Sequence, residues 1–483
     1  MKSSLKRIPF HLATAWALLA LSSPTLDAQA PKNAVLVGTT AMYKLPGTTG
    51  IFYVTLPTSK NAGGKIQALS GKLPPELTVK PGQEGGAWSL LRRPSDGTIF
   101  VGDAAGAGGW CHVHILRMAG LRITSYRSVR VGSVPPNIGR GTVQGLALLP
   151  DGRVLVAGGY PFLKGPLSGG PIGILDDKPK TPTVTPVKLS NTLAQTAVQG
   201  LALSPDGRTA YLTVAALFPI LYPSILYAIP IPTQQTQTVK PKLLHTWKNR
   251  YVSKMTVDRN GVIYTTAVDA ASKNPVAGTI EEIRIVNGKT IVRSTTASLN
   301  VAGVAPRLER ATGKIVLVSA FHPKTVKNNS VLMSDLSGKI SLLAGPPKGG
   351  WGMPFSTQIL NSFETYGEAS PTNKYTFVDF PNPGGLPEVG NKTFSMTVES
   401  ITASPIASFM VLGASQVNVR VLGLQLLTTP ILVLPMSWAK GRATLPLPIP
   451  NETYFRSKAL FAQSIHIQSS IFSASNGLRI EIQ

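Results

Sequence analysis

The sequence predicts an all-β protein: a six-bladed β-propeller followed by a C-terminal β-sandwich. Two observations predict the propeller, namely a hairpin-forming stretch that recurs with a constant period and a set of candidate strands between its copies. A third observation, the loss of that period after about residue 363, predicts the second domain. With 40 Pro and 46 Gly among 483 residues, the composition favours short strands and turns over long helices.

The recurring stretch is clearest at Val143–Arg153 and Val198–Arg208, which read VQGLALLPDGR and VQGLALSPDGR. Asp-Gly between two apolar runs is a strong hairpin signal, because glycine adopts the positive φ that the turn requires. Weaker copies of the stretch have their turn glycines at positions 97, 261 and 313. Together with Gly152 and Gly207 of the clear copies, the turn glycines are spaced 52 to 55 residues apart. That period fits the four short strands of a propeller blade.

A second set of six candidate strands lies between these hairpins. They are Gly50–Leu56, Cys111–Met118, Ile172–Asp176, Ile225–Ile231, Ile280–Val286 and Ser330–Asp335. The first blade lacks an innermost strand before Val35, and a surplus candidate, Phe355–Leu360, follows the last repeat. We expect these two ends to pair and to close a ring over residues 31–363, since closure protects edge strands.

The Leu-x-Pro-Asp-Gly-Arg hairpins resemble those of bacterial periplasmic and secreted six-bladed propellers, including the TolB-like, NHL and sugar-lactonase-like groups. The resemblance covers the blade hairpins only. It implies the architecture and no particular activity, because the matching residues shape a turn.

The pattern changes near Glu364. Lys392–Val398 and Leu478–Ile482 alternate apolar and polar residues, as strands with one buried face do. Short strands of this kind favour a β-sandwich over residues 364–483. The segment resembles a C-terminal domain appended to many secreted bacterial multidomain proteins, which implies secretion or surface placement. The matching residues are Gly390-Asn391-x-x-Phe394, Leu412–Ser415, Leu445–Pro450, Gln463 and Ser475–Ile480.

The N-terminus has the pattern of a secretory signal peptide over residues 1–30. A basic start precedes the apolar run Ala13–Leu21 and the Ala-x-Ala site Ala28–Ala30. We therefore expect a secreted, periplasmic or cell-surface protein. No later stretch predicts a transmembrane helix, because the apolar Ala215–Pro232 contains four prolines. Cys111 is the only cysteine, which excludes intrachain disulfides and cysteine-based zinc sites.

Candidate metal ligands are few. His112 and His114 alternate on a predicted strand and could reach one ion, but the sequence offers no obvious third ligand. Sugar-lactonase-like propellers hold a divalent cation in the channel, whereas the innermost strands here begin without carboxylates. Asp103 and Asp269 are the only acids expected near a mouth, with loop capping as the alternative role. We accordingly predict no metal and no cofactor.

The basic charge indicates an anionic partner. The chain has 47 Lys+Arg against 22 Asp+Glu, and cations beside aromatics in the mouth loops suit an anionic glycan or an acidic protein surface. Scattered basic residues that only keep the protein soluble are the alternative, with the recurring glutamines bonding strand ends. The candidate ligand-binding residues are Gln144, Gln199, Arg140, Arg250, Lys254, Tyr160, His322, Asp103 and Asp269.

These observations favour a non-catalytic binding or interaction protein at the cell envelope. The alternatives are a metal-dependent lactonase-like hydrolase and a structural surface protein attached through its sandwich. Nucleic-acid binding fits the charge but ranks below these, because no recognition motif accompanies it and the protein is expected to be exported.

Overall fold

The computed structural model describes residues 34–41, 49–57, 62–78, 85–94, 96–104, 109–133, 141–159, 164–167, 171–191, 193, 197–215, 224–234, 237–258, 260–269, 278–295, 302–309, 313–320, 329–337, 339–347, 353–360, 363–366, 375–377, 387, 389–400, 405–421, 424–439, 441–452, 459–468 and 471–482. Apart from the single-turn η1 (Pro75–Leu77), the regular structure of this part is β-strand, which confirms the all-β prediction. No helix within it is long and apolar enough to span a membrane. The predicted signal peptide, residues 1–30, lies outside the described residues.

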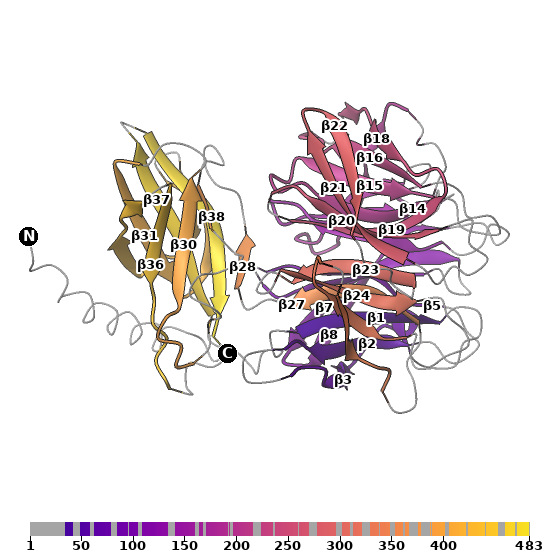
Figure 1. Ribbon diagram of the computed structural model, residues 1–483, viewed down its shortest axis with the longest axis horizontal. Coiled ribbons are helices and arrows are strands. Elements are labelled where there is room, and N and C mark those ends of the chain that lie inside the picture. Colours follow the sequence, from indigo (N-terminus) through magenta and orange to yellow (C-terminus); the bar gives the residue numbers. More distant parts are fainter. Residues whose placement is uncertain are drawn as a thin grey trace, which may run out of the picture.

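In the propeller part of the described chain, four antiparallel sheets have four strands each, and the strands of the first two blades join in one nine-stranded sheet (Figure 1). Blade 1 is β27 (Met353–Leu360), β1 (Ala34–Ala41), β2 (Gly50–Thr55) and β3 (Ile66–Ala68), and blade 2 is β5 (Gly85–Arg92), β6 (Ile99–Asp103), β7 (Trp110–Ala119) and β8 (Arg122–Ser133). Blade 3 is β9 (Val143–Leu148), β10 (Val154–Gly158), β11 (Ile172–Asp176) and β12 (Thr183–Pro186), and blade 4 is β14 (Val198–Leu203), β15 (Thr209–Val214), β16 (Ile225–Pro230) and β18 (Lys242–Thr246). Blade 5 is β19 (Arg250–Val257), β20 (Ile263–Asp269), β21 (Gly278–Val286) and β22 (Lys289–Ser294), and blade 6 is β23 (Ala302–Glu309), β24 (Lys314–Ala320), β25 (Val331–Ser334) and β26 (Ile340–Ala344).

Short parallel pairs link neighbouring blades. β4 (Ser70–Gly71) pairs with β8, and β13 (Lys188–Leu189) pairs with β17 (Thr238–Val239). The turn glycines of the first hairpins all have positive φ, from 69° at Gly207 to 87° at Gly152, as the Asp-Gly signal requires. The repeat therefore sets the hairpins of five successive blades.

The first strand and the last propeller strand lie side by side. β27 pairs antiparallel with β1, in a register that places Val35 opposite Ile359. A side chain at Gly38 would put its Cβ 2.3 Å from Oγ of Ser356 and 2.7 Å from Cβ of Ala87, so the seam needs glycine there. The pairing is the arrangement expected from the missing innermost strand of blade 1.

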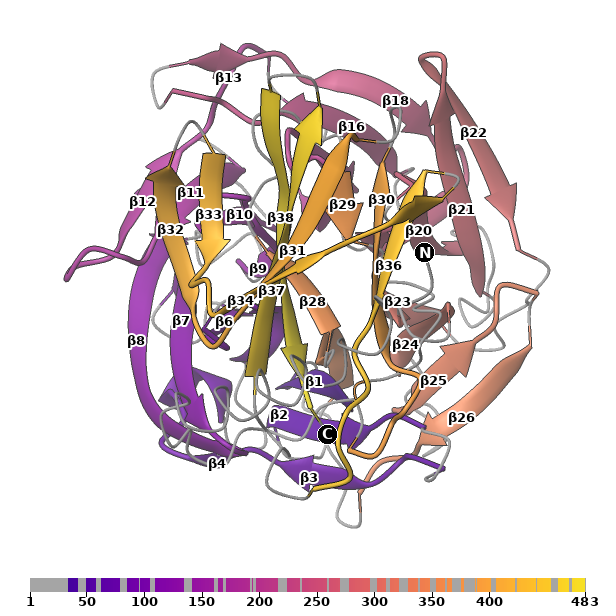
Figure 2. The same ribbon diagram turned by 90° about the vertical axis from the view of Figure 1, so that its left-hand side faces the viewer.

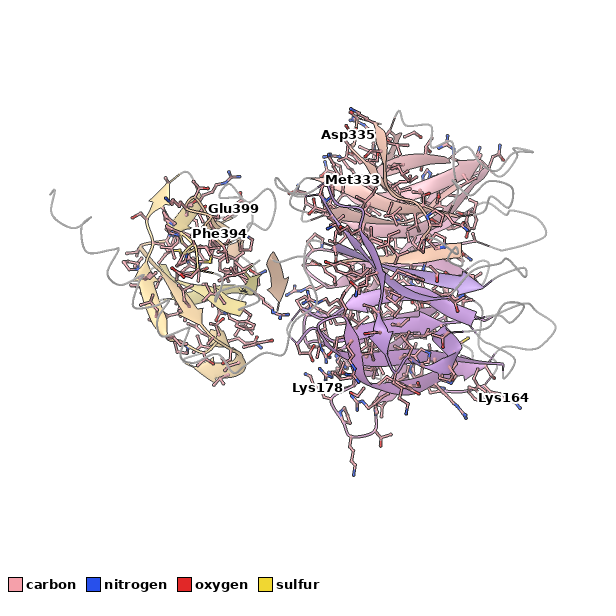
Figure 3. The ribbon with its side chains drawn as sticks, turned by 90° about the horizontal axis from the view of Figure 1, so that it is seen from below. Lys164, Lys178, Met333, Asp335, Phe394 and Glu399 are labelled. Carbon is pink, nitrogen blue, oxygen red and sulfur yellow. The ribbon has the colours of Figure 1, made fainter. Side chains whose placement is uncertain are left out.

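The C-terminal part is a sandwich of two sheets (Figure 2). One sheet has β28 (Phe363–Tyr366), β38 (Ile471–Glu481), β37 (Ala459–Gln468), β31 (Ala407–Gly413) and β34 (Leu432–Pro435). The other has β29 (Tyr375–Phe377), β30 (Ser395–Ser400), β36 (Arg442–Pro446) and β35 (Trp438–Ala439). Their apolar faces enclose one core that includes Phe394 (Figure 3).

A separate hairpin of the C-terminal part consists of β32 (Gln416–Val421) and β33 (Leu424–Thr428). One sandwich strand differs from the sequence prediction. The final strand begins at Ile471 rather than Leu478, because residues 471–474 pair with the far end of β37. A short apolar run in the sequence predicts that a strand exists more reliably than it predicts where the strand begins and ends.

The sandwich lies against one face of the propeller, in front of the ring of blades (Figures 1 and 2). Nη1 of Arg479, on β38, donates a hydrogen bond of 2.6 Å to the carbonyl oxygen of Pro94. Pro94 follows β5, the inner strand of blade 2. The contact therefore places the sandwich beside the end of the channel where the inner strands finish.

Candidate functional site

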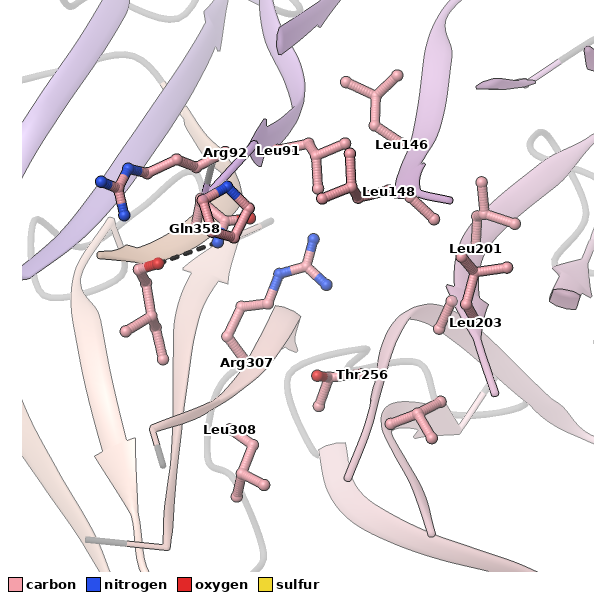
Figure 4. A pocket seen from close by; sticks show the side chains of 15 residues that line it. Leu91, Arg92, Leu146, Leu148, Leu201, Leu203, Thr256, Arg307, Leu308 and Gln358 are labelled. Carbon is pink, nitrogen blue, oxygen red and sulfur yellow. Dashed lines mark hydrogen bonds between the residues drawn. The ribbon is translucent and has the colours of Figure 1, made fainter. Parts of the chain in front are cut away.

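The inner strands of all six blades line a cavity of about 290 Å³ at that end of the channel (Figure 4). Its wall is mostly aliphatic, with leucines contributed by four of the strands. The lining includes Leu91, Leu146, Leu148, Leu201, Leu203 and Leu308, together with Arg92, Thr256, Arg307 and Gln358. Pro94, which accepts the hydrogen bond from the sandwich, also lines it.

Arg307 is the exception to the repeat. Each first hairpin carries an apolar residue six positions before its turn glycine: Leu91, Leu146, Leu201 and Met255. Blade 6 has Arg307 at that position, six residues before Gly313. Figure 4 shows its guanidinium projecting into the cavity between leucines of other strands. The sequence shows that Arg307 occupies an otherwise apolar position only when the five copies are aligned on their turn glycines.

A backbone irregularity precedes Arg307 on β23. The register of β23 on β24 shifts between Val304 and Arg307, which is the mark of a β-bulge. Ala305, inside the bulge, has a φ of 53°, which a residue with a Cβ rarely adopts. The register of β19 on β20 shifts in the same way between Val252 and Met255, so the bulge is shared by blades 5 and 6 and the positive φ of Ala305 is what distinguishes blade 6.

The polar contacts of Arg307 are with main-chain oxygens. Nε donates to the carbonyl of Thr357 at 3.1 Å and Nη1 to that of Met255 at 3.4 Å. Within the part of the chain that the structure describes, Arg307 forms no ion pair. Burial lowers the pKa of Arg307 to about 10, so its guanidinium is still charged at neutral pH. The cavity thus holds a positive charge, and the described residues that line it include no carboxylate.

Lys254 and Gln144 lie deeper along the same channel, in a smaller cavity that Arg307, Leu146 and Leu201 also line. Nζ of Lys254 donates to the carbonyl of Trp88, and burial, with the nearby charge of Arg307, holds the pKa of Lys254 well below its ordinary value. Gln144 is only 2% exposed. Among the described residues, neither amide atom of Gln144 has a hydrogen-bond partner. Two predicted site residues thus lie at the channel axis.

Two other predicted site residues have protein partners instead. Oε1 of Gln199 accepts a hydrogen bond of 2.9 Å from the hydroxyl of Tyr251, which is the strand-end bonding considered as the alternative. Nη1 of Arg250 pairs with the buried carboxylate of Glu281, which also accepts from Nε1 of Trp247 at 2.7 Å. Arg250, a predicted ligand-binding residue on β19, therefore has a carboxylate partner on β21, the third strand of its blade.

The structure brings Asp103 together with the histidine pair. Oδ2 of Asp103 lies 3.0 Å from Nδ1 of His112 and 3.3 Å from Nε2 of His114. One ligand atom from each residue can be chosen so that all three lie within 4.8 Å of one another. Asp103 is buried at the end of β6, so a third potential ligand, which the sequence did not reveal, lies beside the two histidines.

The structure does not describe the side chains of the remaining predicted site residues. Arg140, Tyr160 and His322 lie outside the described residues, and Asp269 is described only as the last residue of β20, opposite Arg250. Lys164, between the second and third strands of blade 3, lies on the side away from the sandwich, whereas Lys178 lies toward it (Figure 3). The leucine-lined cavity opens at the end that faces the sandwich.

No family model matches the sequence, and no curated protein matches it. Among solved structures, a Lactobacillus plantarum protein is 13% identical with a TM-score of 0.41, over 68% of this chain and 99% of that one. A glucose dehydrogenase is 16% identical, with a TM-score of 0.40, over 61% and 96%. A luciferin-regenerating enzyme is 13% identical, with a TM-score of 0.33, over 68% and 96%. These likenesses assign no activity.

Proposed function

We propose that this chain is an exported, non-catalytic binding protein that takes an organic anion with an apolar body into the leucine-lined cavity. The observation that carries the proposal is Arg307, a charged residue without a described carboxylate partner in an aliphatic cavity. A carboxylate, sulfate or phosphate would form charge-assisted hydrogen bonds with the guanidinium, while its apolar part displaces water from the leucines. Export rests on the N-terminal pattern of the sequence.

The aliphatic wall narrows the class of anion. Glycan hydroxyl groups would need polar partners, and a wall of leucines supplies few of them. An alkyl or aryl carboxylate gains from the same wall by burying its carbon chain. An acidic group presented by a protein is the remaining candidate, since an apolar side chain beside it would fill the cavity in the same way.

A divalent cation in the channel has less support. The charged Arg307 would repel it, and the described residues that line the two cavities include no carboxylate. Hard cations need negatively charged oxygen ligands. The lactonase-like alternative, which places its ion in the channel, is therefore not favoured by the charge of this channel.

Arg307→Leu tests the proposal, because it gives blade 6 the leucine that Leu146 and Leu201 supply in blades 3 and 4. We expect octanoate to bind the native protein and to bind the variant at least about 30-fold more weakly, since losing a buried charge partner costs about 2 kcal/mol or more. Octanol, which has the chain without the charge, should bind both proteins equally. Isothermal titration calorimetry measures each affinity.

Arg307→Lys is the matched control, because it keeps the charge and removes the planar fork. Its affinity for octanoate should lie between those of the native protein and Arg307→Leu. Glucuronate serves as the polar anion, and its binding in place of octanoate would favour the glycan. Equal octanoate affinity in the native protein and Arg307→Leu would overturn the proposal.

A further inference from the structure

A second candidate site lies on blade 2, away from the channel. Asp103 ends β6, and His112 and His114 lie two residues apart on the neighbouring strand β7. Because alternate strand residues share a face, both imidazoles point to the same side of the blade. The antiparallel pairing puts Val101 opposite His114 and Gly102 opposite Val113, which brings Asp103 next to His112.

Hydrogen bonds to other groups orient the side chains of Asp103 and His114. Oδ1 of Asp103 accepts from the backbone N–H of His112 at 2.6 Å, which leaves Oδ2 facing the two imidazoles. Nδ1 of His114 lies 2.8 Å from Oγ of Ser128, so its Nε2 is the nitrogen that faces Asp103. Metal-binding histidines are usually held in this way, with the second ring nitrogen bonded to an outer partner that fixes the ring.

We propose that Asp103, His112 and His114 bind one divalent transition-metal ion, with Zn²⁺ as the representative. Ligands at about 2.0–2.2 Å from a tetrahedral zinc lie about 3.4 Å apart, and the two separations from Oδ2, 3.0 and 3.3 Å, are close to that. Two imidazoles and one carboxylate suit zinc, copper, nickel or iron(II), and not calcium or magnesium, which prefer oxygen ligands throughout.

Access and charge are consistent with an ion at this place. Asp103 and His114 are fully buried, whereas the side chain of His112 is 14% exposed and gives a route from solvent. The one cation opposite in register, Arg130, has its guanidinium carbon 5.2 Å from the ring centre of Trp110, in a cation–π contact. With neutral imidazoles, the three ligands carry one negative charge, which favours a cation.

The competing structure is a hydrogen-bond network in which both imidazoles donate to Asp103 and no ion binds. Equilibrium dialysis of the untagged protein against ZnCl₂ after EDTA treatment distinguishes the two, with bound metal counted by atomic spectroscopy. We expect one zinc per chain, displaced by EDTA and not by MgCl₂ or CaCl₂. Thermal melting should show a higher melting temperature with zinc, because the ion binds only the folded state.

His112→Gln is the test variant, since His112 is the ligand with solvent exposure and its replacement disturbs the core least. Zinc affinity should fall by more than about 100-fold. Losing a partner that only hydrogen-bonds to a metal ligand already costs up to about 100-fold, and His112 is a ligand itself. His245→Gln, the same change at another half-buried histidine on β18, should leave the affinity unchanged. Circular dichroism of both variants verifies that they fold.

Absence of stoichiometric zinc in the native protein, or equal zinc binding by His112→Gln, would overturn the proposal. The site is independent of the channel, so Arg307→Leu should retain its zinc. Cobalt(II) gives a second readout, because a tetrahedral nitrogen–oxygen site produces a visible absorption band that an octahedral aqueous ion produces only weakly.

Discussion

Asp177→Ala should lower the free energy of unfolding by about 3 kcal/mol, the lower end of the cost of breaking a buried ion pair. Arg93 and Asp177 are 9% and 3% exposed, and the guanidinium meets the carboxylate through two bonds of 2.6 and 2.9 Å. Asp177 follows β11 in blade 3, while Arg93 follows β5 in blade 2, so the pair ties two blades together. Removal of the Asp177 carboxylate leaves the buried guanidinium of Arg93 with one carboxylate partner fewer.

The electrostatics of Arg93 explain why the loss is not larger. Burial opposes its charge, but Asp177 and Asp96 outweigh that effect and hold the pKa of Arg93 above its ordinary value. Asp96 remains in the variant, with Nε of Arg93 at 3.1 Å and Nη2 at 2.8 Å. One carboxylate therefore still compensates the guanidinium, and the cost stays near the lower end of the range.

Urea unfolding of the native protein and the variant measures the difference. Asp151→Ala is the matched control, because Asp151 pairs with Arg153 in the equivalent turn of blade 3 but is 48% exposed. That pair should contribute less than about 1 kcal/mol. Replacing both members, by Arg93→Met with Asp177→Leu, should recover most of the loss. If Asp177→Ala costs no more than Asp151→Ala, the ion pair does not hold the blades.

The repeat made the propeller predictable, because its signal is local. Asp-Gly and the apolar runs on either side of it determine a hairpin within about ten residues, and Gly97, Gly152 and Gly207 all take the positive φ expected. The sandwich strands carry no such turn signal. Their ends depend on pairing across the sheet, as for residues 471–474 on β37, and sequence periodicity does not register that pairing.

The candidate sites were less predictable, since they depend on contacts between blades or between strands. Arg307 stands where other copies carry Leu146 or Leu201, so alignment on the turn glycines reveals it as an exception. The proximity of Asp103 to His112 depends on the length of the β6–β7 connection, which the sequence alone does not fix. The pairing of Arg250 with Glu281 joins two residues 31 positions apart, on strands that are not neighbours in the blade.

The sandwich should lose about 3 kcal/mol of stability between pH 7 and pH 4 through one histidine. His466 is fully buried on β37, between Oγ of Ser408 at 2.9 Å and Oγ of Ser464 at 2.8 Å. It stacks on Tyr375 with 3.7 Å between ring centres. Burial lowers the pKa of His466 to about 3, so the folded protein keeps it neutral where the unfolded chain takes up a proton.

The sign follows from which state binds the proton. Between about pH 6.5, the ordinary histidine pKa, and about pH 3, the unfolded chain holds a proton that the folded sandwich excludes, so stability falls as the pH falls through that window. The Arg93 partner Asp96 behaves differently. Burial opposes its ionisation, but Arg93 outweighs that and holds its pKa below the ordinary carboxyl value, so its contribution is lost only at lower pH. Of His466 and Asp96, it is therefore His466 that causes the larger change in the free energy of unfolding between pH 7 and pH 4.

His466→Asn isolates the effect, because the amide can still bond Ser408 but does not titrate in this range. We expect the variant to be less stable than the native protein at pH 7 and to lose about 3 kcal/mol less on going to pH 4. His245→Asn, on β18 of the propeller, should keep the native slope for the sandwich. Unfolding measured at both pH values gives the comparison, and an identical acid loss in the native protein and His466→Asn would show that His466 takes up its proton without unfolding the sandwich.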